Sequence, residues 1–377
     1  MLRILPALCL LSALTAADGV TPSAILVGQA CPLDGPAKGL GLGMSLGLKA
    51  AFAEANAGGG VGGRQVELRS VDDGYDPDKC ADATAGLIEE AKVFCLAGLV
   101  GTPTSKAAVP LAVEAGVPVV GLFTGAMAFR EPAQRLVFNV RASYDDETEM
   151  LVERLTADLG AKRIAIFRQN DSFGAAGLSG TEKALKKRSL ELAGAGTFER
   201  NTVAVKTGLA AVLAAKPDAV VMVGPYKPIA AFVREARAAG LACPLATISF
   251  VGTESLIAEL GAEADGLIIS QVVPSPADES LAVVRAYRAA LTKADAAATP
   301  SYVSLEGYIS GRILLLGLAA AGAEPTRDSL VAGLESLTAA DLGGLTAAFG
   351  PQRRQALGQV WLTKVAGGAA RPAASLK

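Results

Sequence analysis

Histidine is missing from all 377 residues of this chain. Without an imidazole, the protein cannot build a Ser-His-Asp or Cys-His catalytic centre or a histidine-ligated metal site. Activation of a nucleophile would depend on lysine, tyrosine or carboxylates, so an enzyme is the least favoured class. We expect no cofactor and no metal, because the acidic pair Asp72-Asp73 at a predicted strand end is more typical of a solvated turn than of a cation site.

A surplus of positive charge is also missing, since 35 Lys and Arg residues stand against 37 Asp and Glu residues, for a net charge of -2. Binding to nucleic-acid phosphates needs a basic stripe, and none is visible. A hydrophobic content of 51% with 19% charged residues describes a well-packed globular chain without large disordered regions. A chain of this length is too long for one ordinary core and suits two lobes.

No apolar run is long enough for a membrane span, which needs about 20 residues. The apolar run 4–14 follows Met1-Leu2-Arg3 and precedes the small residues Thr15, Ala16 and Ala17. This order is typical of a secretory signal peptide cleaved after residue 16 or 17. We therefore expect residues 1–17 to be removed and the mature chain to work in the periplasm without spanning a membrane.

Four of the five cysteines follow the predicted leader: Cys31, Cys80, Cys95 and Cys243. In an exported protein, Cys80 and Cys95 are a plausible disulfide between the start of one helix and the next strand. The alternative is a set of buried free thiols, because cysteine is readily buried. A thiol nucleophile is least favoured, since no histidine is present to activate it.

The stretch from residue 96 to 125 predicts a ligand-binding edge. An apolar run bounded by Gly98 and Gly101 indicates a buried strand, residues 102–105 a helix start, 107–115 a helix and 117–122 a second strand. A strand-helix-strand unit of this kind is a right-handed crossover, and ligands bind outside the carboxyl ends of such strands. Free N–H groups and the helix dipole favour an anion there, although a threonine could equally well only cap the helix. The candidate binding residues at this edge are Thr102, Pro103, Thr104, Leu122, Phe123 and Thr124.

The strand and helix pattern restarts after Arg141, and the strands of the second series also end in polar, glycine-bearing loops. We predict an α/β fold of two doubly wound, open parallel-sheet lobes with a ligand cleft between them. The first lobe would hold residues 18–141 and 272–345, and the second 142–271 and 346–377. The chain would then cross between the lobes near Arg141, Gln271 and Leu345.

Several motifs together resemble the type I periplasmic solute-binding proteins of ABC importers, in the leucine/isoleucine/valine-binding class. They are CPLDGP at 31–36, VELRSVDD at 66–73 with YDP at 75–77, GLVGTPTS at 98–105, VPVVGLFT at 117–124, RIAIF at 163–167 with DSFG at 171–174, and VMVGPY at 221–226. The resemblance covers residues 24–365. It implies an exported, monomeric protein that closes its lobes around a small molecule and delivers it to an ABC permease in the inner membrane.

The resemblance also implies roles for single residues. Thr102 stands where the family holds a ligand carboxylate, Thr124 matches the hydroxyl of the next strand end, and Tyr226 matches an aromatic residue of the second lobe. Where amino-acid binders have aromatic residues, this chain has Leu40 and, in place of a tyrosine, Phe173.

The acidic residue that pairs with a ligand's amino group is replaced by Ser249, unless the nearby Glu254 takes its place. Burying an unpaired ammonium is costly, so the sequence favours a carboxylate or a larger apolar ligand over an amino acid. A branched-chain amino acid ligand and a ligand-sensing receptor subunit stay open as alternatives.

Overall fold

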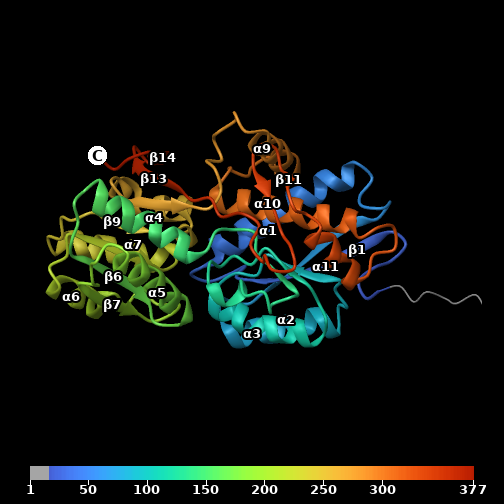
Figure 1. Ribbon diagram of the computed structural model, residues 1–377, viewed down its shortest axis with the longest axis horizontal. Helices are drawn as coiled ribbons and strands as arrows, with labels where there is room; N and C mark the ends of the chain where they lie inside the picture. Colours follow the sequence, from blue (N-terminus) through green and yellow to red (C-terminus); the bar gives the residue numbers. More distant parts are fainter. Residues whose placement is uncertain (1–16) are drawn as a thin grey trace, which may run out of the picture.

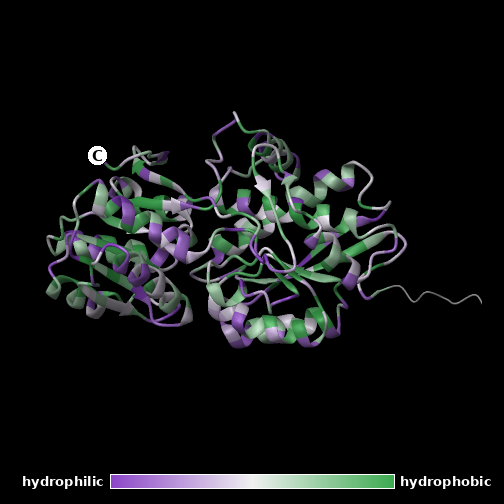
Figure 2. Cartoon of the chain, in the orientation of Figure 1, coloured by the Kyte–Doolittle hydropathy of each residue, from purple (hydrophilic) through white to green (hydrophobic). Residues whose placement is uncertain are grey.

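The computed structural model describes residues 17–377, so the predicted leader lies outside the described residues except for Ala17. Two α/β lobes lie side by side, each built on its own parallel sheet (Figure 1). The sheet of each lobe is predominantly hydrophobic, whereas hydrophilic residues lie on the surrounding helices and loops (Figure 2).

The first lobe has a five-stranded parallel sheet in the order β2-β1-β3-β4-β5. Each strand except β5 is followed by a helix or a short 3-10 turn that returns the chain to the same end of the sheet, as right-handed crossovers require. The elements are β1 (Ala24–Cys31), α1 (Lys38–Ala57), β2 (Gln65–Asp72), α2 (Pro77–Glu89), β3 (Cys95–Ala97), α3 (Thr102–Glu114), β4 (Val119–Val120), η1 (Met127–Phe129) and β5 (Val137–Phe138).

Three further helices return from later in the chain to complete the first lobe: α9 (Ala282–Ala294), α10 (Tyr302–Ala320) and α11 (Arg327–Glu335), followed by the short pair β11 (Ala340–Asp341) and β12 (Thr346–Ala347). Backbones of α1 and α10 touch, because a Cβ on Gly47 would lie 2.0 Å from the Ser304 carbonyl oxygen. Among the described helices, α10 alone has the length and apolar composition of a membrane span. It is nevertheless largely buried against α1 and α11, as the core helix of this lobe.

The second lobe has a seven-stranded sheet in the order β14-β13-β10-β9-β8-β6-β7. The last two strands of the chain run antiparallel at its edge, and the other five are parallel. Strand β8 lies centrally and every residue in it is buried, as expected for a parallel strand covered on both faces. The elements are α4 (Tyr144–Ala157), β6 (Ile164–Gln169), α5 (Ser172–Lys186), β7 (Gly194–Phe198), α6 (Lys206–Ala214), β8 (Ala219–Val223), α7 (Tyr226–Ala238), β9 (Leu245–Thr247), η2 (Ser249–Val251), α8 (Thr253–Leu260), η3 (Gly261–Ala264), β10 (Ile268–Gln271), β13 (Trp361–Ala366) and β14 (Ala369–Pro372).

The third crossing between the lobes lies later than predicted. After Leu345 the chain continues along the first lobe, where the N–H of Leu357 donates to the carbonyl of Val140 at 3.0 Å. The ring of Phe349 meets that of Phe138 edge to face, with centroids 5.2 Å apart. Residues 346–357 therefore pack on the first lobe, and the chain crosses only between Leu357 and β13.

The predicted disulfide between Cys80 and Cys95 is wrong, because both residues are free and buried. Cys80, on α2, packs in the cluster that contains Cys31 and Tyr75. Cys95, on β3, packs in the other cluster, on the opposite face of the sheet. Side chains on the two faces of a sheet point apart, so a bridge between them is geometrically excluded.

Candidate ligand-binding cleft

Two hydroxyl groups meet at the edge of the first lobe that faces the second. Thr102 begins α3, Thr124 follows β4, and their hydroxyl oxygens lie 2.6 Å apart in a buried position. Gly101 precedes the helix with φ 103° and supplies no side-chain cap to its first turn. Uncapped N–H donors and the helix dipole make this corner favourable for an anion.

Glycine is required at position 101, because a Cβ there would lie 2.7 Å from the Tyr75 ring. The hydroxyl of Thr104 points back into the same turn, towards the carbonyl oxygens of Val100 and Gly101. Thr104 therefore stabilises the turn, and its hydroxyl proton is not free for a ligand.

A cavity of about 230 Å³ opens beside this hydroxyl pair, between α3 of the first lobe and α5 of the second. Thr102 and Lys106 line it from the first lobe, and Tyr144 and Ser172 from the second. The volume lies below the range of about 300–1,000 Å³ that holds drug-sized ligands. Of the ten predicted binding residues, Thr102 is the one that lines this cavity.

An aromatic cluster joins the lobes behind the cavity. Phe250 lies at its centre, with ring centroids 4.4 Å from Phe173, 5.2 Å from Phe123 and 6.2 Å from Tyr75. Phe123 and Tyr75 belong to the first lobe, whereas Phe173 and Phe250 belong to the second. Phe250 and Tyr75 were not predicted as site residues, although each lies three residues beyond the end of a strand, after β9 and β2.

Leu40 and Tyr226 also join the lobes. The phenol oxygen of Tyr226 accepts a hydrogen bond from the N–H of Gly39 at 3.2 Å. A Cβ on Gly252 would lie 2.6 Å from a methyl group of Leu40, so the Leu40 side chain packs directly against the Gly252 backbone. Both predicted residues therefore contact the opposite lobe directly. Of the remaining predicted residues, Leu122 is buried in the core and Pro103 is half-buried in the first turn of α3.

A buried polar network lies at the first crossing, around Arg141, which sequence analysis identified only as a crossing point. The guanidinium donates to the Glu147 carboxylate at 2.9 Å and to the Ser249 hydroxyl, and lies 3.5 Å from the Glu306 carboxylate. Glu147 also accepts from the N–H of Ser249 at 2.8 Å. Burial raises the pKa of the Glu306 carboxyl to about 7, although the positive charge of Arg141 acts to lower this pKa.

Neither Ser249 nor Glu254 lines the cavity, so neither offers a partner to the amino group of a ligand there. The hydroxyl of Ser249 is engaged by Arg141. Glu254 lies at the other side of the lobe interface, where it accepts from the N–H of Tyr302 at 3.0 Å. Burial raises the pKa of the Glu254 carboxyl to about 7.

The rim of the cleft carries a contact between lobes at the turn after β7. Arg200 of the second lobe donates to the carbonyl of Tyr75 at 2.8 Å, and its guanidinium carbon lies 4.3 Å from the centroid of the Tyr75 ring. Asp171 holds the guanidinium at 2.5 Å. The amide of Asn201 donates to the carbonyl of Gly74 at 3.2 Å. Arg200 and Asn201 thus connect the second lobe to the loop after β2.

A family model described as periplasmic binding protein matches residues 24–370. The chain belongs to this family. The predicted family and fold class are therefore confirmed, and membership implies a periplasmic or extracellular place of action for a solute-binding protein.

This binding protein is similar to several solved structures. A possible leucine/isoleucine/valine-binding protein from Rhodopirellula baltica SH 1 is 37% identical, with a TM-score of 0.89, over 96% of this chain and 98% of that one. A fatty acid ABC transporter substrate-binding protein from Thermomonospora curvata is 23% identical, with a TM-score of 0.84, over 95% and 93%. The branched-chain amino acid binding protein LivJ from Streptococcus pneumoniae, in complex with isoleucine, is 20% identical, with a TM-score of 0.80, over 93% and 99%. No curated protein sequence matches the chain.

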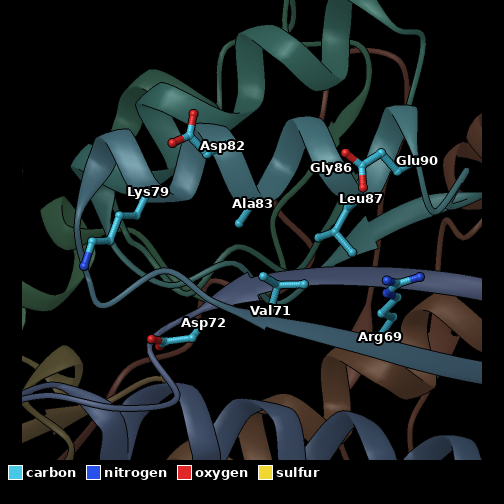
Figure 3. A pocket seen from close by; sticks show the side chains of 9 residues that line it. All are labelled: Arg69, Val71, Asp72, Lys79, Asp82, Ala83, Gly86, Leu87 and Glu90. Atoms are coloured by element: carbon cyan, nitrogen blue, oxygen red, sulfur yellow. The ribbon is translucent and has the colours of Figure 1, made fainter.

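A larger cavity of about 490 Å³ lies on the outer side of the first lobe of this binding protein, between β2 and α2 (Figure 3). All its lining residues come from one lobe, so closure of the lobes does not shape it. Asp72 at its end accepts from the N–H groups of Leu33 at 2.7 Å and Gly74 at 3.2 Å, and so stabilises the loop. Within residues 17–377, no group of three acidic or cysteine side chains could hold a metal ion.

Proposed function

We propose that this protein is the substrate-binding component of an ABC importer and captures a small carboxylate between its lobes. The observation that carries the proposal is the Thr102–Thr124 hydroxyl pair at the uncapped start of α3, beside a cavity lined by both lobes. One of the two hydroxyls donates to the other, so the pair keeps one proton for a ligand, and together with the unpaired N–H groups it can donate to one carboxylate. Closure then shields this contact from water.

The polar groups around the cleft argue against an α-amino acid. An ammonium needs a free carboxylate, and both oxygens of Glu147 are already engaged, by Arg141, Ser249 and Ser270. Glu254 does not line the cavity, and Asp145, which does, is paired with Lys183 at 2.7 Å. The walls of the cavity include Ala126, Met127, Ala175 and Ala176, which suit an apolar body. The favoured ligand is a carboxylate with an apolar body.

Branched-chain amino acid binding is the second candidate, because the names of two similar structures point to it. A ligand-sensing receptor subunit would use the same cleft. We propose a monomer that docks on an ABC permease, with no catalytic role and no cofactor. Copurification with an ABC permease from the native membrane tests this assignment, whereas copurification with a signalling protein would favour the receptor.

Titration calorimetry with 4-methylpentanoate and leucine tests the ligand class, because the two molecules differ by the amino group alone. We expect 4-methylpentanoate to bind more tightly, since the cleft leaves the ammonium of leucine unpaired. Micromolar binding of leucine, about -8.2 kcal/mol, without binding of 4-methylpentanoate would refute the carboxylate assignment and favour the second candidate.

A further inference from the structure

The cavity between α3 and α5 is lined by two lysines in different electrostatic situations. Lys183 of the second lobe lies 2.7 Å from the carboxylate of Asp145, which also lines the cavity, so this pair is neutral. Lys106 of the first lobe is exposed and has no ion-pair partner among the described residues. The cavity therefore has one unbalanced positive charge, at Lys106.

Lys106 lies one helical turn beyond Thr102 on the same face of α3, because residues four apart on a helix are neighbours. The Cβ atoms of such residues are about 5–6 Å apart, and the lysine side chain reaches further. Both residues line the same cavity. The cavity thus has two places that favour an anion, one at its inner end and one at its mouth.

The inner end has a further polar group without a partner. The phenol oxygen of Tyr144 is buried, lines the same cavity and makes no hydrogen bond within the described chain. Its ring lies beside Phe173, with centroids 5.4 Å apart, so the phenol is held by packing. A carboxylate at Thr102 and Thr124 would supply an acceptor for this hydroxyl, as buried polar groups require.

Between the two polar ends, alanine side chains form part of the wall on both sides. Ala126 and Ala128 belong to the first lobe, and Ala175 and Ala176 to the second. Small apolar side chains on both sides make the passage narrow, although two serines of α5 also line it. A ligand that fills it should have an uncharged, unbranched middle and polar groups at its ends.

We propose that this cavity binds a small dicarboxylate, with one carboxylate at Thr102 and Thr124 and the second paired with Lys106 at the mouth. This inference rests on the proposed function, and adds the second charge of the ligand and the residue that selects it. Lys106 is a specificity-determining residue, because a monocarboxylate of the same length leaves its charge unpaired.

Adipate, its monomethyl ester and hexanoate are suitable probes, since they share a six-carbon acid chain and differ at the far end. Calorimetry on the full mature protein should show adipate binding about two- to fivefold more tightly than the ester, the upper part of the range for an exposed ion pair. Sodium chloride should weaken adipate binding more than hexanoate binding, because the mouth is exposed to solvent.

Variants distinguish the effect of the Lys106 charge from a loss of folding. In Lys106→Gln the ratio of the affinities for adipate and for its ester should fall close to one. Lys106→Arg should retain the ratio of the native protein. The double variant Asp145→Asn with Lys183→Gln removes a neutral pair from the same cavity and should also retain the preference. Circular dichroism confirms that each variant is folded.

The outcomes distinguish this inference from the proposed function. Equal binding of adipate and its ester to the native protein, or an unchanged preference in Lys106→Gln, overturns the dicarboxylate assignment. Binding of hexanoate without binding of adipate also overturns the dicarboxylate assignment, but it is consistent with the proposed carboxylate-binding function. If none of the three acids binds, both proposals fail.

Discussion

Replacement of Arg200 by alanine should weaken ligand binding although this side chain does not line the cavity. Its contact with the first lobe consists of one charged hydrogen bond to the Tyr75 carbonyl and one cation–π contact with the Tyr75 ring. A hydrogen bond from a charged group contributes about 1.5–3 kcal/mol, and an exposed cation–π contact about 0.5–1 kcal/mol. The ion pair with Asp171 lies within the second lobe and is kept when the lobes open. It therefore contributes nothing to the free-energy difference between the closed and open forms.

The closed form should therefore lose about 2–4 kcal/mol of stability, which corresponds to a fall in affinity of roughly 30- to 900-fold when binding requires closure. Calorimetry gives the affinity, and small-angle scattering gives the fraction of closed molecules. Arg163→Ala is the matched control, because Arg163 hydrogen-bonds only within the second lobe, to the carbonyls of Lys216 and Ala215. An affinity for Arg200→Ala within twofold of the control would refute the reasoning.

Three further predictions concern the site, the pH response and the thiols. Thr102→Val keeps the shape of the side chain but removes a hydroxyl, and should cost about 1.5–3 kcal/mol of affinity for a carboxylate by calorimetry; an unchanged affinity would remove Thr102 from the site. Burial raises the pKa of the Glu254 carboxyl to about 7, so the folded protein favours its protonated form. The free energy of unfolding should fall as the pH rises from about 4.5 to about 7, by at most about 3 kcal/mol, and urea titrations should show a flatter profile for Glu254→Gln; identical profiles would contradict this assignment. Cys80 and Cys95 should both be alkylated in urea without reductant, and a disulfide-linked peptide in the mass map would contradict the structure.

The sequence was sufficient to predict the two lobes, because alternating strand and helix patterns leave few topologies for a parallel sheet. The rule that ligands bind at the carboxyl ends of parallel strands also predicted Thr102 and Thr124 at one edge of the sheet, and their hydroxyl oxygens lie 2.6 Å apart there. Their role in binding stays a prediction. The rule worked here because both residues belong to one lobe and to neighbouring strands.

Contacts between the lobes were harder to predict, because they depend on how two separate sheets face each other. Phe250 and Arg141 illustrate this limit, since Phe250 contacts Phe123 and Arg141 contacts Ser249, in each case far away in sequence and in the other lobe. The error at Cys95 has a local cause. In the three-residue strand β3, a shift of one position exchanges the faces of the sheet, and sequence patterns do not fix so short a register.

The order of elements along the chain has a consequence for biosynthesis. The first lobe begins at β1 but needs α10, which comes late in the chain, to cover one face of its sheet. The second lobe begins at α4 but is completed by β13, which pairs with every residue of β10. Neither core can therefore close while the ribosome is still translating the last part of the message. A nascent chain with this topology stays incomplete until synthesis is nearly finished, which favours passage through a translocation channel before the chain folds.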